Sequence, residues 1–209
     1  MNKDQPIVVA FIGCFNPPTN GHIHAMVIAH DILVDSGFIV EKIVMIPSNS
    51  GYSKPGLLSG ETRCEMCKLA TKHMKYVEVD DFESKQEKWP RTINTLEYLS
   101  SKYPGTRTMI LCGVDLVETF DSKWREPDVI RILEEFGLIV VPRNKGTEDL
   151  PSLCKIMIGR TQNVISTRDN PLLTVSSSLV REYINRGHKI SGLVDPMVEL
   201  YIESNKLFS

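Results

Sequence analysis

The segment that decides the fold is Gly13-Cys14-Phe15-Asn16-Pro17-Pro18-Thr19-Asn20-Gly21-His22. An apolar, β-branched run at Ile7–Ile12 precedes it, and a helical pattern of apolar residues over Gly21–Val34 follows it. This order predicts a buried strand that turns directly into a helix. The first N–H groups of such a helix have no partner within it, and its positive end faces whatever lies above the sheet. The segment therefore predicts a site for an anion.

The rest of the chain continues the alternation of strand and helix. Apolar runs predict further strands at Lys42–Ile46, Tyr76–Val79, Thr108–Cys112, Gly137–Val141 and Asn163–Ser166. Helix-period segments separate the runs, at Gly21–Val34, Glu61–Met74, Arg91–Tyr103 and Pro127–Phe136. We expect an α/β fold with a doubly wound parallel sheet that helices cover on both faces. Ligands of such sheets bind beyond the carboxyl ends of the strands, where the pattern places Gly13, Pro47, Gly113 and Pro142.

A second motif, Val175-Ser176-Ser177-Ser178-Leu179-Val180-Arg181, places three hydroxyls and a guanidinium at the start of a helix predicted over Ser177–Arg186. The two motifs together predict a polyphosphate, such as a nucleoside triphosphate, held between two helix ends. We place Arg181 on the first turn, where the helix dipole does not favour a cation and a forked guanidinium suits phosphate oxygens. Serines before a helix are also common N-caps, and a surface ion pair is the alternative for Arg181. Asp195 and Pro196 resemble the cap and first turn of a last helix, so we expect a helical C-terminal segment from about residue 175.

Length and composition narrow the function classes. With 209 residues, of which 42% are hydrophobic, the chain can form a closed core, and we expect one domain over residues 1–209. A net charge of −2 and a pI near 6.2 give no basic field for nucleic acid or an anionic membrane, so we expect neither as a partner. The first residues, Met1–Pro6, lack the pattern of a secretion signal, and we expect an intracellular protein of the cytoplasm or nucleus. Composition is compatible with a monomer or a homo-oligomer.

The cysteines suggest no metal site. Of the five, only Cys64 and Cys67 form a Cys-x-x-Cys pair, and no second pair completes a zinc site. The pair lies in a helical pattern, which favours core packing. We therefore expect no metal bound by the protein itself.

Helical geometry selects between two histidines of the first motif. If Thr19 stands at the helix start, the spacing of three residues places its hydroxyl and the imidazole of His22 on one side of the first turn. His24 lies about 200° further round the helix, because each residue advances about 100°. We therefore choose His22 as the phosphate ligand. An isolated histidine more often packs or caps, but its neighbours here favour binding.

Other residues suggest nucleoside contacts. Asp115 follows a predicted strand in Gly113-Val114-Asp115, where its carboxylate can accept ribose hydroxyls or cap a helix. Trp89 and Trp124 lie in predicted loops, where a ring can stack on a planar ligand or pack against protein. Polar stretches at Asn49–Gly60 and Asp81–Pro90 are predicted loops over the site. The sequence has neither a Walker-type loop nor a Gly-x-Gly-x-x-Gly fingerprint, which disfavours a P-loop NTPase and a Rossmann dehydrogenase.

These residues resemble the nucleotidyltransferase superfamily, whose signature joins Gly-x-Phe-x-Pro-x-x-x-x-His to Ser-Ser/Thr-x-x-Arg. From Val8 to about Phe208 the chain is similar to the eukaryotic-type nicotinamide mononucleotide adenylyltransferases. The narrower likeness rests on Gly13-Cys14-Phe15-Asn16-Pro17-Pro18-Thr19, Lys68-Leu69-Ala70-Thr71-Lys72, Trp89 with Thr92, Cys112-Gly113-Val114-Asp115-Leu116 and Gly137-Leu138-Ile139-Val140.

The resemblance implies a Rossmann-like nucleotidyltransferase fold and the reaction of ATP with nicotinamide mononucleotide, or nicotinic acid mononucleotide, to give NAD or its deamidated form and pyrophosphate. It implies Mg²⁺ bound through the ATP phosphates. Catalysis is assigned to His22, Thr19 and Arg181. ATP binding falls to Gly13, Phe15, His22, Gly113, Asp115, Ser177, Ser178 and Arg181. Mononucleotide binding falls to Cys14, Phe15, Lys54, Trp89, Thr92 and Trp124.

The chain departs from the family pattern at three places. Cys14 stands where a serine is frequent, Ser53-Lys54-Pro55 replaces a run of lysines, and Ser177-Ser178 replaces Ser-Thr. The phosphate motifs alone also fit a sister transferase acting on another phosphorylated acceptor, such as phosphopantetheine or a polyol phosphate. A nucleotide-binding chaperone without turnover is the alternative from a different class.

Overall fold

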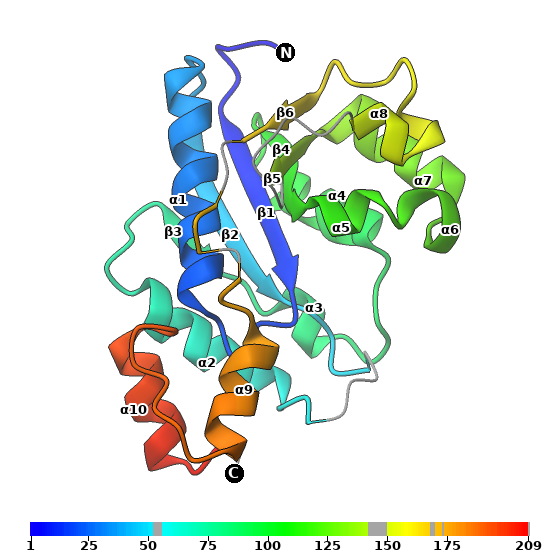
Figure 1. The fold of residues 1–209 in the computed structure, drawn as a ribbon. Helices are drawn as coiled ribbons and strands as arrows, with labels where there is room; N and C mark the ends of the chain where they lie inside the picture. Colours follow the sequence, from blue (N-terminus) through cyan, green and yellow to red (C-terminus); the bar gives the residue numbers. More distant parts are fainter. Residues whose placement is uncertain (52–55, 142–149, 168–169, 173, 209) are drawn as a thin grey trace. The chain divides into compact units, whose positions relative to one another are not determined.

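The computed structural model describes residues 1–51, 56–141, 150–167, 170–172 and 174–208 (Figure 1). Its sheet has six strands in the order β3-β2-β1-β4-β5-β6. Their bounds are β1 Ile7–Gly13, β2 Val40–Pro47, β3 Val77–Val79, β4 Arg107–Gly113, β5 Leu138–Val141 and β6 Val164–Ser166. Every predicted strand is present. The order reverses its direction of growth at β1, as expected for a doubly wound sheet.

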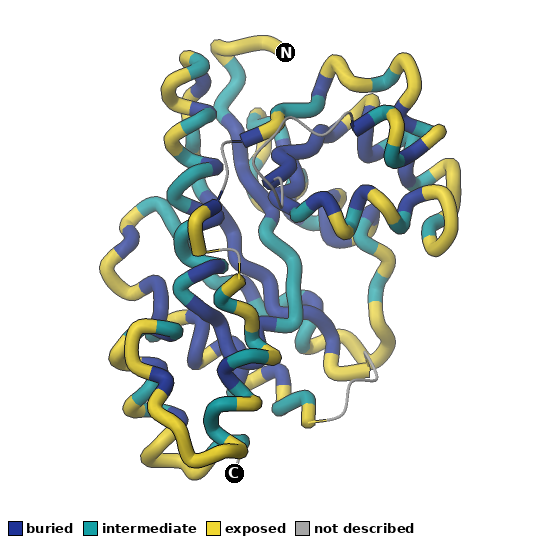
Figure 2. Tube along the Cα trace, viewed as in Figure 1, coloured by how far each residue is buried: buried dark blue, intermediate teal, exposed yellow. Residues whose placement is uncertain are grey.

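The central strands pair in parallel and are buried. β1 pairs with β4 in the register Ile7↔Arg107, and β5 lies between β4 and β6. All four residues of β5 are buried, as are the first four of β1 (Figure 2). Strands covered on both faces read as continuous apolar runs, which is why the sequence located them well. The predicted α/β class and doubly wound parallel sheet, flanked by helices, are confirmed.

Helices fill the intervals between strands. Their bounds are α1 Asn20–Asp35, α2 Gly60–Thr71, α3 Phe82–Lys85, α4 Thr92–Lys102, α5 Val114–Val117, α6 Phe120–Lys123, α7 Glu126–Arg131, η1 Ile132–Phe136, α8 Leu150–Leu153, η2 Lys155–Met157, α9 Ser177–Asn185 and α10 Pro196–Ser204. The helix predicted over Pro127–Phe136 is α7 followed by a π-helical turn, η1. The loop predicted over Asp81–Pro90 contains the short helix α3.

The chain divides into two compact units, each assembled from three stretches. One comprises residues 1–11, 26–43 and 91–170, and the other residues 12–25, 44–90 and 171–209. In the second unit, α2, α9 and α10 share a core that includes Met66, Val180, Val198 and Ile202 (Figure 1). Cys64 and Cys67 are buried on α2, which confirms their packing role. That the chain is one domain stays a prediction.

The C-terminal helices form as the sequence predicts. Asp195 caps α10 by accepting a hydrogen bond of 2.8 Å from the main-chain N–H of Met197, and Pro196 occupies the first turn. α9 begins at Ser177, but its N-cap is Ser176, whose hydroxyl accepts from the N–H of Leu179 at 3.2 Å. The N-cap role that is the alternative for Ser177 and Ser178 therefore belongs to Ser176.

The part of the chain that the structure describes contains no helix long and apolar enough to cross a membrane.

Candidate active site

The first motif leaves β1 with a buried phenylalanine in the left-handed backbone region. Phe15 has φ 46° and a relative exposure of only 2%. A Cβ added to Gly13 would lie 3.0 Å from Cζ of Phe15, so the glycine leaves room for the ring. The ring meets the imidazole of His22 edge to face, with centroids 5.2 Å apart. Phe15 therefore supports His22 from the core.

Hydrogen bonds define the protonation of His22. The main-chain N–H of Thr19 donates to Nδ1 of His22 at 3.0 Å, so Nδ1 carries no proton and the neutral ring is protonated at Nε2. The hydroxyl of Thr19 lies 2.8 Å from the same nitrogen and 2.7 Å from the carbonyl oxygen of Val175, so its one proton serves these two acceptors. Thr19 and His22 thus share one side of the first turn, as predicted. The Thr19 side chain is, however, 1% exposed and faces the protein.

Burial keeps His22 neutral. Desolvation lowers the pKa of His22 from 6.5 to about 4, because burial removes water that would stabilise the charged imidazolium. At neutral pH the ring therefore offers a hydrogen-bond donor, Nε2–H, without a formal charge. Such a donor suits an anion whose charge is balanced by other groups.

The start of α1 packs tightly against the segment that leads to α9. A Cβ on Gly21 would lie 2.6 Å from the carbonyl oxygen of Leu172 and 2.9 Å from that of Val175. These distances are too short for any side chain. Gly21 is thus required so that the two motifs can approach each other within their unit.

Helix α9 binds the first motif through two side chains. The hydroxyl of Ser177 donates to the carbonyl of Pro17 at 2.7 Å, and Nη1 of Arg181 donates to the carbonyl of Asn16 at 2.7 Å. Nη2 of Arg181 also donates to Oγ of Ser178 at 3.2 Å. The predicted convergence of the two motifs is therefore present. Arg181 is the fifth residue of α9, so it lies just past the first turn where it was predicted, and its long side chain reaches back to the first motif.

Two residues that sequence reasoning missed hold the motif in place. Asn16 is buried; its amide donates to the carbonyl of Gly56 at 2.9 Å and its Oδ1 accepts from the N–H of Leu58 at 3.2 Å. Arg63, on α2, is completely buried and donates to the carbonyls of Cys14 at 2.9 Å and Ser48 at 2.7 Å. An arginine in an amphipathic helix is normally read as exposed, so no sequence signal marked it.

Among the described residues, no acidic side chain forms an ion pair with Arg63 or Arg181, the two arginines that contact the first motif. Throughout the described residues, the hydrogen bonds of Arg63 and Arg181 end on neutral oxygens: main-chain carbonyls and serine hydroxyls. The charge of Arg181, which is only partly buried, therefore remains available to a bound anion, despite the net negative charge of the chain.

The predicted adenosine residues lie in the other unit. Gly113 is the last residue of β4 and the N-cap of α5, and Asp115 stands in the first turn of that helix. A Cβ on Gly113 would collide with the carboxylate of Asp115, so the side chain folds back over the glycine. Thr92, the first residue of α4, is in the same unit.

The two tryptophans differ in their surroundings. Trp89 is 53% exposed, as a stacking residue requires. Trp124 packs edge to face on Phe120 at 5.2 Å between centroids, and its Nε1–H donates to Oγ1 of Thr119 at 3.0 Å. Cys14, half-buried, accepts a hydrogen bond from the hydroxyl of Ser48 at 3.6 Å. Lys54 and Pro142 lie outside the described residues.

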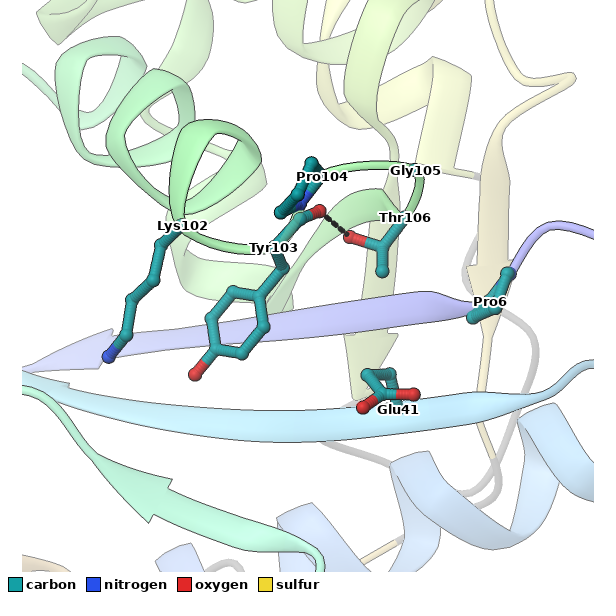
Figure 3. A pocket seen from close by; sticks show the side chains of 7 residues that line it. All are labelled: Pro6, Glu41, Lys102, Tyr103, Pro104, Gly105 and Thr106. Carbon is teal, nitrogen blue, oxygen red and sulfur yellow. Dashed lines mark hydrogen bonds between the residues drawn. The ribbon is translucent and has the colours of Figure 1, made fainter.

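A hollow of about 400 Å³ lies at the opposite, amino ends of the strands in the unit that contains β4 to β6 (Figure 3). Its lining is Pro6, Glu41 and Lys102 to Thr106. Figure 3 shows the hydroxyl of Thr106 directed at the carbonyl of Tyr103, to which it donates at 2.7 Å. In open α/β sheets the amino ends of the strands are not the usual ligand edge, so this hollow is separate from the candidate site.

Within the described ranges, no group of three or more His, Cys, Asp or Glu side chains is arranged to hold a metal ion.

Comparison with known proteins agrees with the fold and the motifs. The family model described as cytidylyltransferase-like matches residues 10–183. The nicotinamide/nicotinic acid mononucleotide adenylyltransferase of Oryza sativa subsp. japonica is 34% identical over 96% of this chain and 85% of its own length. The nicotinamide/nicotinic acid mononucleotide adenylyltransferase 1 of Bos taurus is 29% identical over 100% of this chain and 90% of its own.

Solved structures share the fold at lower identity. The Plasmodium falciparum nicotinic acid mononucleotide adenylyltransferase complexed with NaAD has a TM-score of 0.73 and 19% identity, covering 98% of this chain and 97% of that one. The same protein complexed with APC has a TM-score of 0.71 and 18% identity, covering 97% and 96%. The chain belongs to the cytidylyltransferase-like family and, within it, to the nicotinamide and nicotinic acid mononucleotide adenylyltransferases.

Proposed function

We propose that this chain transfers the adenylyl group of ATP to the 5′-phosphate of nicotinamide mononucleotide or nicotinic acid mononucleotide, with release of pyrophosphate. The observation that carries the proposal is the pair of hydrogen bonds from Ser177 and Arg181 to the first motif. These bonds bring the start of α9 to the start of α1, and helix starts favour phosphate. The names of the relatives supply the acceptor.

The reaction needs no nucleophile from the protein. An oxygen of the mononucleotide 5′-phosphate attacks the α-phosphorus of ATP, a new P–O bond forms, and the bond from that phosphorus to the β-bridging oxygen breaks. The electron pair leaves with pyrophosphate. Because the attacking phosphate is already ionised at neutral pH, no general base is required. The protein therefore contributes position and charge.

His22 and Arg181 are the catalytic groups in this proposal. His22 donates from Nε2 to the phosphate oxygens that gain charge as the bond breaks, since its Nδ1 is occupied by the N–H of Thr19. Arg181 has five N–H donors, and its bonds to Asn16 and Ser178 leave others for the β- and γ-phosphates. Thr19, a predicted catalytic residue, acts here by holding the imidazole in one tautomer.

The remaining assignments follow the family resemblance. We assign the triphosphate to the first motif at Gly13 and Phe15, and to Ser177 and Ser178 on α9. We assign the adenosine to Gly113 and Asp115. The mononucleotide is assigned to Cys14, Phe15, Lys54, Trp89, Thr92 and Trp124.

Mg²⁺ enters with the nucleotide in this proposal. The groups at the first motif include N–H donors, a hydroxyl and a guanidinium, which suit phosphate oxygens. In this proposal the phosphates and water would supply the ligands of Mg²⁺. When bound, Mg²⁺ neutralises part of the charge of the triphosphate.

The test is NAD formation by the purified full chain with ATP, Mg²⁺ and nicotinamide mononucleotide, beside nicotinic acid mononucleotide. Parallel reactions replace ATP with CTP, and the acceptor with phosphopantetheine or a polyol phosphate, and follow pyrophosphate release. We expect turnover with ATP and one or both pyridine mononucleotides. Turnover confined to another acceptor identifies a sister transferase. ATP binding without pyrophosphate release from any acceptor identifies a non-catalytic nucleotide-binding protein.

A further inference from the structure

Arg63 connects three segments near the first motif while completely buried. It lies in the first turn of α2, which Ser59 caps by accepting from the N–H of Thr62 at 3.1 Å. Its Nε donates to the carbonyl of Leu58 at 3.0 Å, in addition to the bonds to Cys14 and Ser48. One planar group thus fixes the turns after β1 and β2 and the entry to α2.

The environment of Arg63 is unfavourable for a charge. Burial lowers the pKa of its guanidinium, and across the described residues its acceptors are all neutral oxygens. An apolar side chain at this position would leave the carbonyls of Leu58, Cys14 and Ser48 without this donor. The hydrogen bonds of the guanidinium, and not its charge, are therefore what this position uses.

The bond to Cys14 sets the direction of one peptide group in the first motif. The carbonyl of Cys14 and the N–H of Phe15 belong to the same planar trans peptide and point in opposite directions. Because Arg63 holds that carbonyl, the N–H of Phe15 is turned away from Arg63. The preceding residue of the motif is held too, since the N–H of Ser48 donates to the carbonyl of Gly13 at 2.8 Å.

We propose that Arg63 is a positioning residue of the polyphosphate site: its guanidinium holds the Cys14 carbonyl so that the N–H of Phe15 faces the bound phosphate. The inference rests on the proposed function for the identity of the anion. A lysine at the same position keeps the charge but cannot hold three carbonyls in one plane. The test variant should therefore remove the planar guanidinium of Arg63 and keep its charge.

The test compares Arg63→Lys with Arg107→Lys, a matched control. Arg107 also donates from Nε and Nη2 to a main-chain carbonyl, that of Phe136, and burial also lowers its pKa, but it lies in the other unit. Calorimetric titration of the full chain with inorganic pyrophosphate gives the affinity, and thermal melting gives the stability. We expect Arg63→Lys to weaken pyrophosphate binding by at least about tenfold, the effect of losing one charge-assisted or oriented hydrogen bond. The affinity of Arg107→Lys for pyrophosphate should lie within twofold of the wild-type affinity, a difference of about 0.4 kcal/mol.

Equal pyrophosphate affinity in folded Arg63→Lys and the wild type overturns the proposal. If Arg63→Lys does not fold, amide hydrogen exchange of the wild type decides: pyrophosphate should slow exchange at the N–H of Phe15, and an unchanged rate there overturns the proposal. If the wild type does not bind pyrophosphate, the proposal is overturned as well. Pyrophosphate binding that depends on Arg63, without NAD formation, contradicts only the proposed function.

Discussion

The arginines around the first motif and those on the helical surface of the other unit have different partners. Arg63 and Arg181 donate to neutral oxygens. Arg131, in contrast, bridges Glu97 and Glu135 at 2.8 Å each. The first arrangement leaves positive charge unbalanced within the protein, and the second cancels it.

This difference separates charge kept for a ligand from charge used on the surface. Exposed ion pairs contribute about 0–1 kcal/mol to stability, so the pairs of Arg131 are of small consequence. A cation near the protein interior with only dipoles around it is unfavourable until an anion arrives. In the proposed function, the charge of Arg181, unpaired among the described residues, attracts phosphate to the first motif despite the net charge of −2.

The largest effect is expected for His22→Ala. Removing a preorganised donor to a developing oxyanion typically raises the barrier by about 3 kcal/mol, so kcat for NAD formation should fall about a hundredfold or more while the fold persists. His24→Ala is the control, because that side chain lies on another side of α1. Near-normal turnover in His22→Ala would show that the first motif is not the catalytic region.

Arg181→Met tests the comparison directly beside Arg131→Met. We expect kcat/KM for ATP to fall about tenfold to 150-fold in Arg181→Met, since a charged donor to phosphate contributes about 1.5–3 kcal/mol. Arg131→Met should keep its kcat/KM and change the free energy of unfolding by less than about 1 kcal/mol. An equal fall of kcat/KM in both variants would mean that the presence or absence of an acidic partner does not distinguish the two arginines.

The tryptophans should separate in the same way. Trp89→Ala should raise KM for the mononucleotide about tenfold, because the variant lacks the ring that stacks on the pyridine. KM for ATP and the melting temperature should change little, because the Trp89 side chain is exposed. Trp124→Ala should lower the melting temperature through lost packing on Phe120 and the lost bond to Thr119. Steady-state kinetics and thermal melting measure both. Equal effects of Trp89→Ala on the two substrates would argue against stacking on the pyridine ring.

The smallest effect is the titration of His22. Its pKa of about 4 lies below the ordinary 6.5, so as pH falls the unfolded chain takes up the proton first. The contribution of His22 to stability is therefore complete above about pH 6.5 and declines towards pH 4. Nitrogen NMR of the folded chain should show the Nε2–H tautomer throughout the neutral range. A ring that carries protons on both nitrogens at pH 6 would contradict the neutral donor.

Sequence patterns predicted the sheet more completely than the site. Strands such as β1 and β5 are buried on both faces, so each is a continuous apolar run between turn residues. Such runs can be recognised in the sequence. The spacing of Thr19 and His22 predicted their shared side of the helix, and the structure confirms it. These features depend on local periodicity.

The unpredicted features depend on contacts between distant segments. Nothing near Arg63 in the sequence indicates that its partners are Cys14 and Ser48, 49 and 15 residues away. Likewise, the reach of Arg181 to Asn16 spans 165 residues. The inward orientation of Thr19 follows from the carbonyl of Val175, which only the packed structure brings near.

A crystal structure of the full chain with a non-hydrolysable ATP analogue and Mg²⁺ tests the central claim most directly. We predict phosphate oxygens within hydrogen-bonding distance of Nε2 of His22, the guanidinium of Arg181 and the N–H of Phe15, with Arg63 still bonded to the carbonyl of Cys14. A triphosphate bound elsewhere, with His22 and Arg181 untouched, would contradict the account.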